Sequence, residues 1–275
     1  MIESISSKLK SWAQTHLSPL KIDFMSLNRL RLNQRAESVF EDNIPYVEQS
    51  KKGLLDLRAY LSDTAFTYEN PKVLLNPFGM APLFAVIIFY TENNTSVSYC
   101  VKGHRDETSF SRHLEECSQT HLVPIVGLYP SEANIVTLTI YDDNKNIVAK
   151  KDIVISTGSL PYDMYQDDCL NYLTFLDKDG DIRYYIDLRT NQETAALLPN
   201  HHLALVENVC MTPNYMDKSP THFHDINLFG FTYRTYYVAT GIDHIDYDAD
   251  NNYFYIQSHE QVNHFEDAVL EMSPQ

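Results

Sequence analysis

The chain has little glycine and little cysteine, and each shortage limits the turns or the kinds of site that the protein can contain. It has 8 glycines among 275 residues, so asparagine and aspartate, which tolerate left-handed backbone, are expected to occupy many of its tight turns. The four cysteines are too far apart for a Cys-x-x-Cys metal or redox motif, and they form no pattern typical of a small secreted disulfide scaffold. They are Cys100, Cys117, Cys169 and Cys210.

Long apolar runs are also missing. The N-terminal stretch MIESISSKLKSWAQTH has neither a continuous apolar region nor a cleavage-site pattern, so it is not expected to be a signal peptide. The longest apolar run, from Ala81 to Tyr90, is too short to span a bilayer. These features predict a cytoplasmic chain with no membrane partner.

Positive charge is scarce. Lysine and arginine number 21 against 37 aspartates and glutamates, which gives a formal net charge of −16. Such a chain repels phosphate backbones, and its densest basic stretch, Arg29 to Arg35, is short, so no nucleic-acid partner is expected. The chain also lacks a GxSxG elbow, a P-loop and a GxGxxG loop, which argues against a nucleotide enzyme or an α/β-hydrolase. We expect no cofactor.

Tyrosine and phenylalanine are abundant, at 19 and 13, and favour β structure. Residues 1 to about 62 are predicted to be helical, because apolar positions recur at spacings of three and four in ISSKLKSWAQTHL (residues 5–17) and in VEQSKKGLLDLRAYL (residues 47–61). After Pro71 come short β runs such as SVSYCV, VTLTIY and KKDIVIST, separated by the turn signals NPFG, ENNT and DDNKN. Strands at this spacing predict an Ig-like antiparallel β-sandwich.

A third region begins after Leu160-Pro161. Its β runs are joined by turns, as in YLTFLDKDGDIRYYIDL, and they read as antiparallel four-stranded units. The predicted fold class is therefore mainly β. We divide the chain into a helical N-terminal arm (1–70), the sandwich (71–161) and the hairpin region (162–275).

Two groups of side chains could in principle hold a metal. DKDGD, from Asp177 to Asp181, resembles the start of a calcium loop, but the remaining EF-hand spacing fails and a hairpin turn is predicted instead. The histidines gather in short clusters, and zinc held by His222, His224 and His244 is the weaker alternative to solvated or hydrogen-bonded histidines on strands. We predict no metal site. The other histidines of this region are His201, His202, His259 and His264.

The middle of the chain resembles the N-terminal β-sandwich of bacterial aryl-sulfate sulfotransferases. The likeness lies in VLLNPFGMAPL, VSYCVKGH, THLVPIVGLY and ANIVTL, which match the family pattern in order and roughly in spacing over residues 71–161. Downstream, YLTFLDKDGDIRYYIDL resembles the first strands of the family's β-propeller. In INLFGFTYRTYYVATGIDHIDYDADNNYFYI, His244 precedes Asn251 by seven residues, as a family histidine does. The resemblance covers residues 70–275.

The resemblance implies an enzyme that moves a sulfuryl group from an aryl sulfate donor to a phenolic acceptor through a sulfated histidine. A neutral imidazole is nucleophilic near pH 7, and polar groups around it can stabilise charge on the sulfuryl oxygens. By the same resemblance, His244 corresponds to a channel histidine that helps to bind the sulfuryl group, and the nucleophile has no counterpart in this chain. The alternative is that His244 is an incidental strand histidine.

The chain departs from the family pattern in two ways. It stops after roughly one propeller blade, and propellers depend on closure to protect their edges. PNHH and DNN stand where the family has Asn-Gly turns, and His201 is expected to fit a left-handed position poorly. We therefore predict an incomplete β-propeller and a chain that is inactive alone, either the N-terminal fragment of a split or decayed gene or one half of an enzyme completed by a C-terminal chain. The alternative is a non-catalytic interaction module that forms a homodimer.

Overall fold

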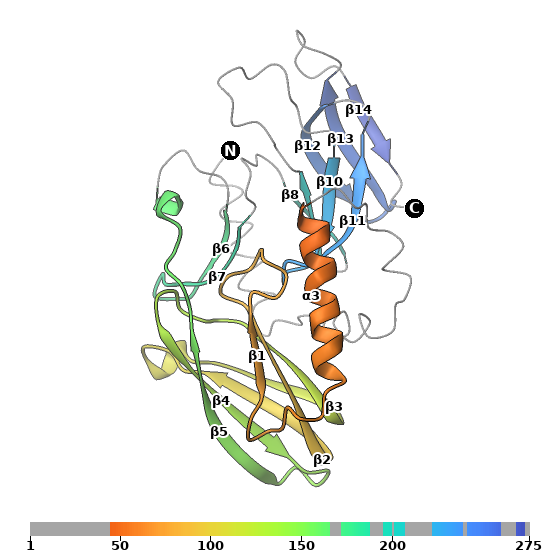
Figure 1. Ribbon diagram of the computed structural model, residues 1–275. Helices are drawn as coiled ribbons and strands as arrows, with labels where there is room; N and C mark the ends of the chain where they lie inside the picture. Colours follow the sequence, from red (N-terminus) through yellow and green to blue (C-terminus); the bar gives the residue numbers. More distant parts are fainter. Residues whose placement is uncertain are drawn as a thin grey trace. The chain divides into compact units, whose positions relative to one another are not determined.

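The computed structural model describes residues 45–165, 172–187, 195–199, 201–206, 222–238, 241–259 and 268–272. Within these ranges lie one α-helix and fourteen β-strands, which confirms the predicted mainly β fold class (Figure 1). Two short 3₁₀ helices, η2 (Asp106–Thr108) and η3 (Tyr162–Tyr165), connect strands. The helix expected within residues 5–17 lies outside the described residues.

The α-helix, α3, spans Pro45–Leu61, which confirms the helix expected in VEQSKKGLLDLRAYL. Proline is favoured at the first helical position because its missing N–H would have had no partner there. Leu54 and Leu57, three residues apart, are both buried, and they share one face of the helix. The helix contacts β2, β3 and β11. It therefore covers part of the sandwich and reaches a strand of the following region.

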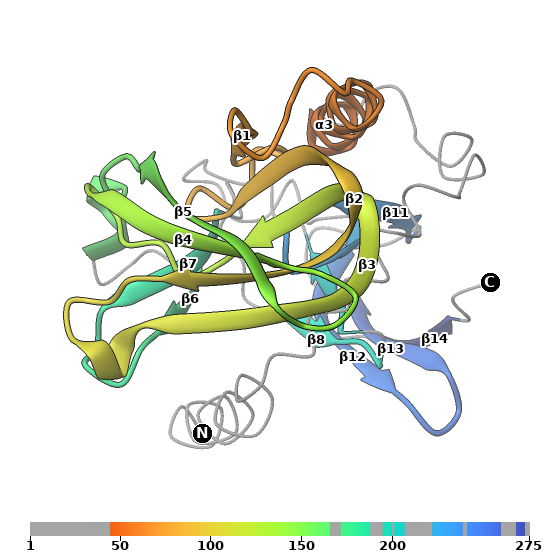
Figure 2. The same cartoon turned by 90° about the horizontal axis from the view of Figure 1, so that it is seen from below.

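Five antiparallel strands form the sandwich. The long β2 pairs with β1 along its first half and with β4 along its second, while β3 accompanies it on the other side throughout. Figure 2 shows how β2 and β3 curve, so that one continuous sheet supplies both layers. The strands are β1 (Lys72–Leu75), β2 (Ala85–Val101), β3 (Phe110–Ile125), β4 (Ala133–Tyr141) and β5 (Ile147–Ser156).

One predicted turn is wrong. ENNT, Glu92 to Thr95, was expected to separate two strands, but β2 runs through it with a shift in register against β3. The irregularity is stabilised from inside: the Nε2 atom of the buried His121 lies 3.2 Å from Thr91 Oγ1 and 2.9 Å from Thr95 Oγ1. Because these polar atoms satisfy one another, the strand bends without breaking.

The core of the sandwich follows from strand alternation. From Thr95 to Val101 the odd-numbered residues of β2, such as Val97 and Tyr99, are buried, and the even-numbered residues between them are half-buried. Ile87, Val123 and Leu138 join the same cluster from β2, β3 and β4. Val86 and Ile88 are also buried, although they lie on the opposite face. Helix α3 contacts this strand.

The remaining strands form three small antiparallel sheets. β6 pairs with β7, the strands β8 to β11 form a four-stranded meander, and β12 to β14 form a three-stranded one. A second apolar cluster, including Phe223, Ile245 and Phe254, joins the two meanders. The strands are β6 (Tyr172–Leu176), β7 (Ile182–Asp187), β8 (Ala195–Leu197), β9 (Leu203–Val206), β10 (His222–Ile226), β11 (Thr232–Tyr237), β12 (Gly241–Asp248), β13 (Tyr253–His259) and β14 (Ala268–Met272).

One turn design recurs in four hairpins. In each, the first residue donates its N–H to the fifth carbonyl, the fourth donates to the first carbonyl, and the fourth has a positive φ. In three of them the first residue is Asp or Asn, and its Oδ1 accepts two backbone N–H groups at 2.8–3.1 Å. The turns are Asp142–Asn146, Asp177–Asp181, Leu198–His202 and Asn227–Phe231. The expectation that Asp and Asn build the turns is confirmed for these three.

Candidate functional site

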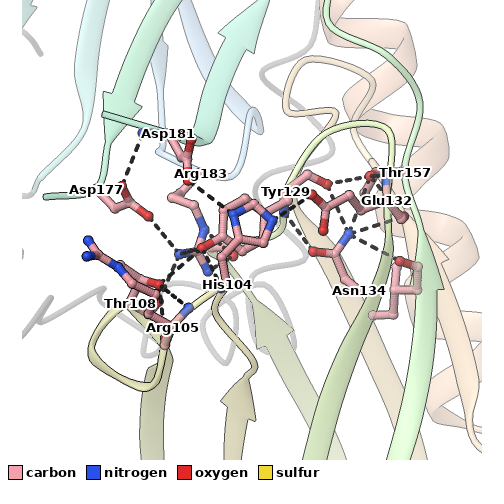
Figure 3. A network of polar contacts seen from close by, with 12 residues as sticks. His104, Arg105, Thr108, Tyr129, Glu132, Asn134, Thr157, Asp177, Asp181 and Arg183 are labelled. Atoms are coloured by element: carbon pink, nitrogen blue, oxygen red, sulfur yellow. Dashed lines mark hydrogen bonds and ion pairs between the residues drawn. The ribbon is translucent and has the colours of Figure 1, made fainter. Parts of the chain in front are cut away.

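The segments that carry the family resemblance meet in a polar network between the sandwich and the β6–β7 hairpin, which we call the junction network (Figure 3). At its centre is Arg183 on β7, which is only 7% exposed. Its Nε donates to the Gly127 carbonyl at 2.9 Å, and one terminal nitrogen donates to the Thr108 carbonyl at 2.8 Å. The same nitrogen lies 3.1 Å from Asp177 Oδ2. A buried cation is thus satisfied by two backbone carbonyls and one carboxylate.

Tyr129 links the buried arginine to the surface. Its ring centroid lies 3.8 Å from the Arg183 guanidinium carbon and 3.9 Å from the centroid of the His104 ring, which stacks on it at 18°. Two groups this close must occupy opposite faces of the phenol ring. The Tyr129 hydroxyl also accepts a 2.9 Å hydrogen bond from Arg183. The three side chains therefore form one stack, with cation–π attraction on the arginine side.

His104 lies between two carboxylates. Its Nε2 is 2.7 Å from Glu132 Oε1, and its Nδ1 is 3.2 Å from Asp181 Oδ2. A neutral imidazole has only one N–H, so both contacts become hydrogen bonds only when the ring is protonated. The hydrogen bond to Glu132 is the main reason why the pKa of His104 is raised above its ordinary value, and Asp181 acts in the same direction.

Two further ion pairs join the loop before β3 to the β6–β7 turn. Arg105 pairs with Asp179 in a forked contact, in which its Nε lies 2.9 Å from Oδ2. Lys178 lies 2.5 Å from the Glu107 carboxylate and lowers the pKa of that group. Both pairs are largely exposed and each contributes little alone. Together they place complementary charges on the two facing loops.

Asn134 holds the loop that carries Tyr129. It is buried, its Oδ1 accepts the Tyr129 N–H at 2.7 Å, and its Nδ2 donates to the Tyr129 and Ile155 carbonyls at 3.0 and 3.3 Å. The ANIVTL segment of the resemblance thus contributes a side chain that fixes a loop. Its role in the network is to position Tyr129, not to react.

A second junction involves α3 and NPFG, residues 76–79. Gly53 of α3 is close to this segment, and a β-carbon added to it would lie 2.2 Å from the Pro77 carbonyl oxygen. Phe78 packs edge-on against Phe231 at 5.2 Å between ring centroids. The hydroxyl of the buried Ser50 accepts the Thr232 N–H at 3.1 Å. The helix thereby links the sandwich to the turn and strand of the β10–β11 hairpin.

Chemically, the junction network holds segments together. Its hydrogen bonds join protein groups to one another, and its single imidazole is placed between two carboxylates. Sequence reasoning missed this site, although it noted both the Asp-Gly turn before Arg183 and the glycine before His104 as parts of the resemblance. The only signal in the sequence was an arginine, Arg183, close after the Asp-Gly turn. Its hydrogen-bond partners, Thr108 and Gly127, are far from it in the chain and could not be inferred.

His244, the predicted sulfuryl-binding residue, lies on another sheet. It is on β12 opposite Gln257, directly after a shift in register, and its side chain is exposed. The neighbouring Ile245 is buried, while Asp246 is exposed. An acidic side chain therefore lies two residues from His244 among the exposed positions of β12. The structure does not bring His244 to Arg183 or to His104.

Of the other histidines after residue 161, His202 and His224 are buried and hydrogen-bonded within the protein, and His201 lies in a turn. His202 is buried, stacks on Tyr233 at 4.3 Å and has its Nδ1 2.6 Å from Asp225 Oδ1. His224 is buried, with its Nδ1 3.0 Å from Thr235 Oγ1. His201 is exposed in a turn. The side chains of His222 and His259, and all of His264, lie outside the described residues.

The zinc alternative combined His222, His224 and His244. His224 and His244 lie in different sheets. Within the described ranges, no group of three or more His, Cys, Asp or Glu side chains is arranged to hold a metal ion. Nor does the described part of the chain contain a helix both long and apolar enough to cross a membrane.

The fold and the junction network define an Ig-like β-sandwich to which the β6–β7 hairpin is anchored by a buried arginine. Residues 72–158 match the family model of the arylsulfotransferase Ig-like domain. The resemblance predicted from the sequence is thus confirmed over these residues. No curated protein matched the chain.

Proposed function

We propose that this protein is part of an aryl-sulfate sulfotransferase, which transfers a sulfuryl group from an aryl sulfate to a phenol. The observation that carries the proposal is the match of residues 72–158 to the arylsulfotransferase Ig-like domain. It is supported by the two antiparallel meanders that follow and share an apolar cluster, because stacked sheets of this kind suit a propeller.

In this proposal the transfer takes two displacements. A neutral histidine nitrogen first attacks the sulfur, so that an N–S bond forms while the aryl O–S bond breaks and phenolate leaves. The oxygen of the acceptor phenol then attacks the same sulfur, and the N–S bond breaks as the phenol loses its proton to water, which balances the proton that the released phenolate takes up. The histidine returns unchanged, so no cofactor is consumed.

His244 is proposed to hold the sulfuryl group, not to attack it. Its exposure on β12 leaves it accessible to a ligand. Because sulfuryl oxygens carry negative charge and Asp246 lies nearby on the strand, cationic groups from further strands are needed to offset the repulsion. We propose that the nucleophilic histidine and these cations are supplied by residues other than the 275 of this chain. A complementing C-terminal chain is one source.

The binding role is tested by NMR with 4-nitrophenyl sulfate. The imidazole resonance of His244, assigned with the His244→Ala variant, is expected to shift saturably with the sulfate ester and not with 4-nitrophenol. His113, an exposed histidine of the sandwich, is the matched control and should not respond. Equal responses of the two histidines, or no response at His244, would sink the assignment.

The catalytic role is tested separately, by release of 4-nitrophenol from the ester in the presence of phenol. The purified chain is expected to release none above the rate of an unfolded sample. Turnover that His244→Ala abolishes and His113→Ala preserves would show that the chain is active alone, contrary to the proposal.

The second candidate is a non-catalytic interaction module. One observation favours it: Ile147, Val148 and Val154 of β5 are exposed aliphatic side chains on an edge of the sandwich. Apolar residues on an exposed sheet edge are a common site of strand pairing between chains. This candidate needs no catalytic residue, and both functions could be carried by one protein.

A further inference from the structure

Strands β12 and β13 present an exposed face that carries His244. The two strands are adjacent and antiparallel (Figure 1), and His244 lies directly opposite Gln257 in their register. Residues directly opposite each other in an antiparallel pair lie on the same face of the sheet. On β13, Phe254 and Ile256 are buried in the apolar cluster that joins the two meanders, whereas Gln257 is only half-buried. His244 and Gln257 are therefore neighbours on the face that points away from that cluster.

A β-bulge determines which way His244 points. The register of β12 against β13 shifts between Ile242 and His244, and Asp243 has no opposite residue. Ile242 and Ile245 are both buried although they are three residues apart, which an uninterrupted strand does not allow because its side chains alternate. The extra residue lets both isoleucines reach the core while His244 stays exposed. Bulges are frequent next to active sites, where they re-aim a side chain.

Neither side chain is used inside the protein. Within the residues that the structure describes, neither the His244 imidazole nor the Gln257 carboxamide makes a hydrogen bond to another side chain or to the backbone. By contrast, the Nδ1 atom of His202 lies 2.6 Å from Asp225 Oδ1, so that ring is already held by the fold. The donors of His244 and Gln257 lie side by side on one sheet face and are available to a ligand.

We propose that Gln257 is a second residue that binds the sulfuryl group of the aryl sulfate, together with His244. The imidazole offers an N–H and the carboxamide offers two, so each side chain can donate to a different sulfuryl oxygen. The β-carbons of directly opposed residues are roughly 5 Å apart, which allows both side chains to reach one sulfuryl group. The inference rests on the proposed role of His244, and it adds no covalent step to the transfer.

The carboxamide suits an anion in these acidic surroundings. Asp246 lies opposite Tyr255, one exposed pair further along the strands, and residues two apart on a strand are roughly 7 Å apart. At that distance its carboxylate repels a sulfate ester, but it does not occupy the donors of His244 and Gln257. A glutamine contributes two N–H groups that do not titrate, so it offsets part of the repulsion at any pH.

NMR titration of the whole chain with 4-nitrophenyl sulfate tests the inference. The side-chain amide resonances of Gln257, assigned with the Gln257→Leu variant, are expected to shift saturably and with the same dissociation constant as the imidazole resonance of His244. 4-Nitrophenol, which lacks the sulfuryl group, should leave the amide resonances unchanged. Gln119, an exposed glutamine of β3, is the internal control and should not shift with either compound.

Gln257→Leu also measures what the carboxamide contributes. It removes both N–H donors at nearly constant side-chain volume, so the dissociation constant read at His244 should rise by roughly tenfold, as expected for a hydrogen bond to a charged group. Gln119→Leu makes the same change on the sandwich and should leave the dissociation constant unchanged. Neither glutamine is buried, so both variants are expected to fold, which far-UV CD verifies.

The outcomes separate this inference from the proposed function. A response of His244 without one of Gln257, or a Gln257→Leu variant that binds the ester within about threefold of wild type, overturns the role of Gln257 and leaves that of His244 intact. If neither residue responds, both this inference and the proposed role of His244 are wrong. Equal shifts at Gln257 and Gln119 would also overturn the inference, because they would reflect nonspecific binding of the ester.

Discussion

The buried arginine of the junction network shows how one residue can hold two segments together. Arg183 donates to the carbonyls of Thr108 and Gly127 and contacts Asp177. Removing one partner of a buried charged group leaves the others desolvated and unpaired, which costs far more than an exposed ion pair contributes.

We therefore expect Arg183→Met to lower the free energy of unfolding by about 3–5 kcal/mol. Arg105→Met is the matched control, because Arg105 is an exposed arginine paired with Asp179, and it should cost less than about 1 kcal/mol. Urea unfolding followed by CD measures both. Similar losses for the two variants would mean that the burial of Arg183 does not increase its contribution to the free energy of unfolding.

His104 makes the junction sensitive to pH. Glu132 and Asp181 face its two ring nitrogens, Tyr129 faces the ring, and Arg183 lies beyond Tyr129. Its pKa is raised above the ordinary value of 6.5, chiefly by the hydrogen bond to Glu132. Since the raised value belongs to the folded state, the stabilisation is fully present below the unfolded pKa and is lost as pH rises through the folded pKa.

The stability difference between wild type and His104→Gln should accordingly be largest below pH 6.5 and shrink on going to more alkaline pH. NMR titration of His104 should give a pKa above 6.5, and Glu132→Gln should move it down. A His104 that titrates at or below its ordinary value would contradict the two-carboxylate contact.

Among the elements, the hairpin turns allow a direct comparison of residues at the same position. The fourth residue of the recurring turn is Gly180 in one hairpin and His201 in another, with φ of 89° and 62°. A residue with a β-carbon is disfavoured in this region by about 1 kcal/mol. His201 adopts it nevertheless, although the sequence predicted a poor fit, and its turn has Leu198 in place of the acceptor Asp or Asn.

His201→Gly is expected to raise the free energy of unfolding by about 0.5–1 kcal/mol, because glycine relieves the unfavourable backbone. Gly180→Ala is expected to lower it by about 1 kcal/mol. Nothing lies within 4 Å of a β-carbon at Gly180, so that loss would be conformational and not steric. Thermal unfolding of both variants checks the opposite signs. Two changes of the same sign would refute a common turn design.

How much the sequence could predict differs from element to element. The alternation in VTLTIY and KKDIVIST correctly predicted β4 and β5, because their buried and exposed faces repeat every two residues. The ENNT turn was wrong because His121 on another strand satisfies Thr91 and Thr95. The junction network was missed for the same reason: hydrogen bonds from Arg183 to Thr108 and Gly127 depend on pairing between segments, which local patterns do not contain.

Only part of the candidate site could be predicted from the sequence. The family resemblance led to His244 by its spacing from Asn251. The structure places His244 at an exposed position on β12, and its role stays a prediction. His104 was noticed only as the last residue of the VSYCVKGH motif, and no role was predicted for it. Its partners Glu132 and Asp181 come from a different loop and a different hairpin, so no periodicity in the sequence connects them.

For the molecule as a whole, α3 connects the sandwich to the β10–β11 hairpin. Gly53 allows the helix to approach Pro77, and Ser50 accepts the Thr232 N–H. Alanine is normally a better helix former than glycine by about 1 kcal/mol. At Gly53, however, the added methyl group would meet the Pro77 carbonyl oxygen at 2.2 Å.

We therefore expect Gly53→Ala to destabilise the protein by about 1–3 kcal/mol in spite of its helix propensity. Gly158→Ala is the control, because nothing lies within 4 Å of a β-carbon there. Hydrogen exchange should show faster exchange in α3 and at Thr232 for Gly53→Ala alone. A stabilised Gly53→Ala variant would show that the helix is not held against Pro77.

The β6–β7 hairpin follows the sandwich in sequence but supplies part of its interior. Tyr185 belongs to the core cluster of the sandwich, and the Asp187 N–H donates to the Met80 carbonyl at 2.8 Å. During translation, β5 therefore leaves the ribosome before the residues that complete the core around it. A nascent chain halted between Ser156 and Ile182 would expose unfinished apolar surface to chaperones, and the domain would close only once Arg183 and Tyr185 emerged from the exit tunnel.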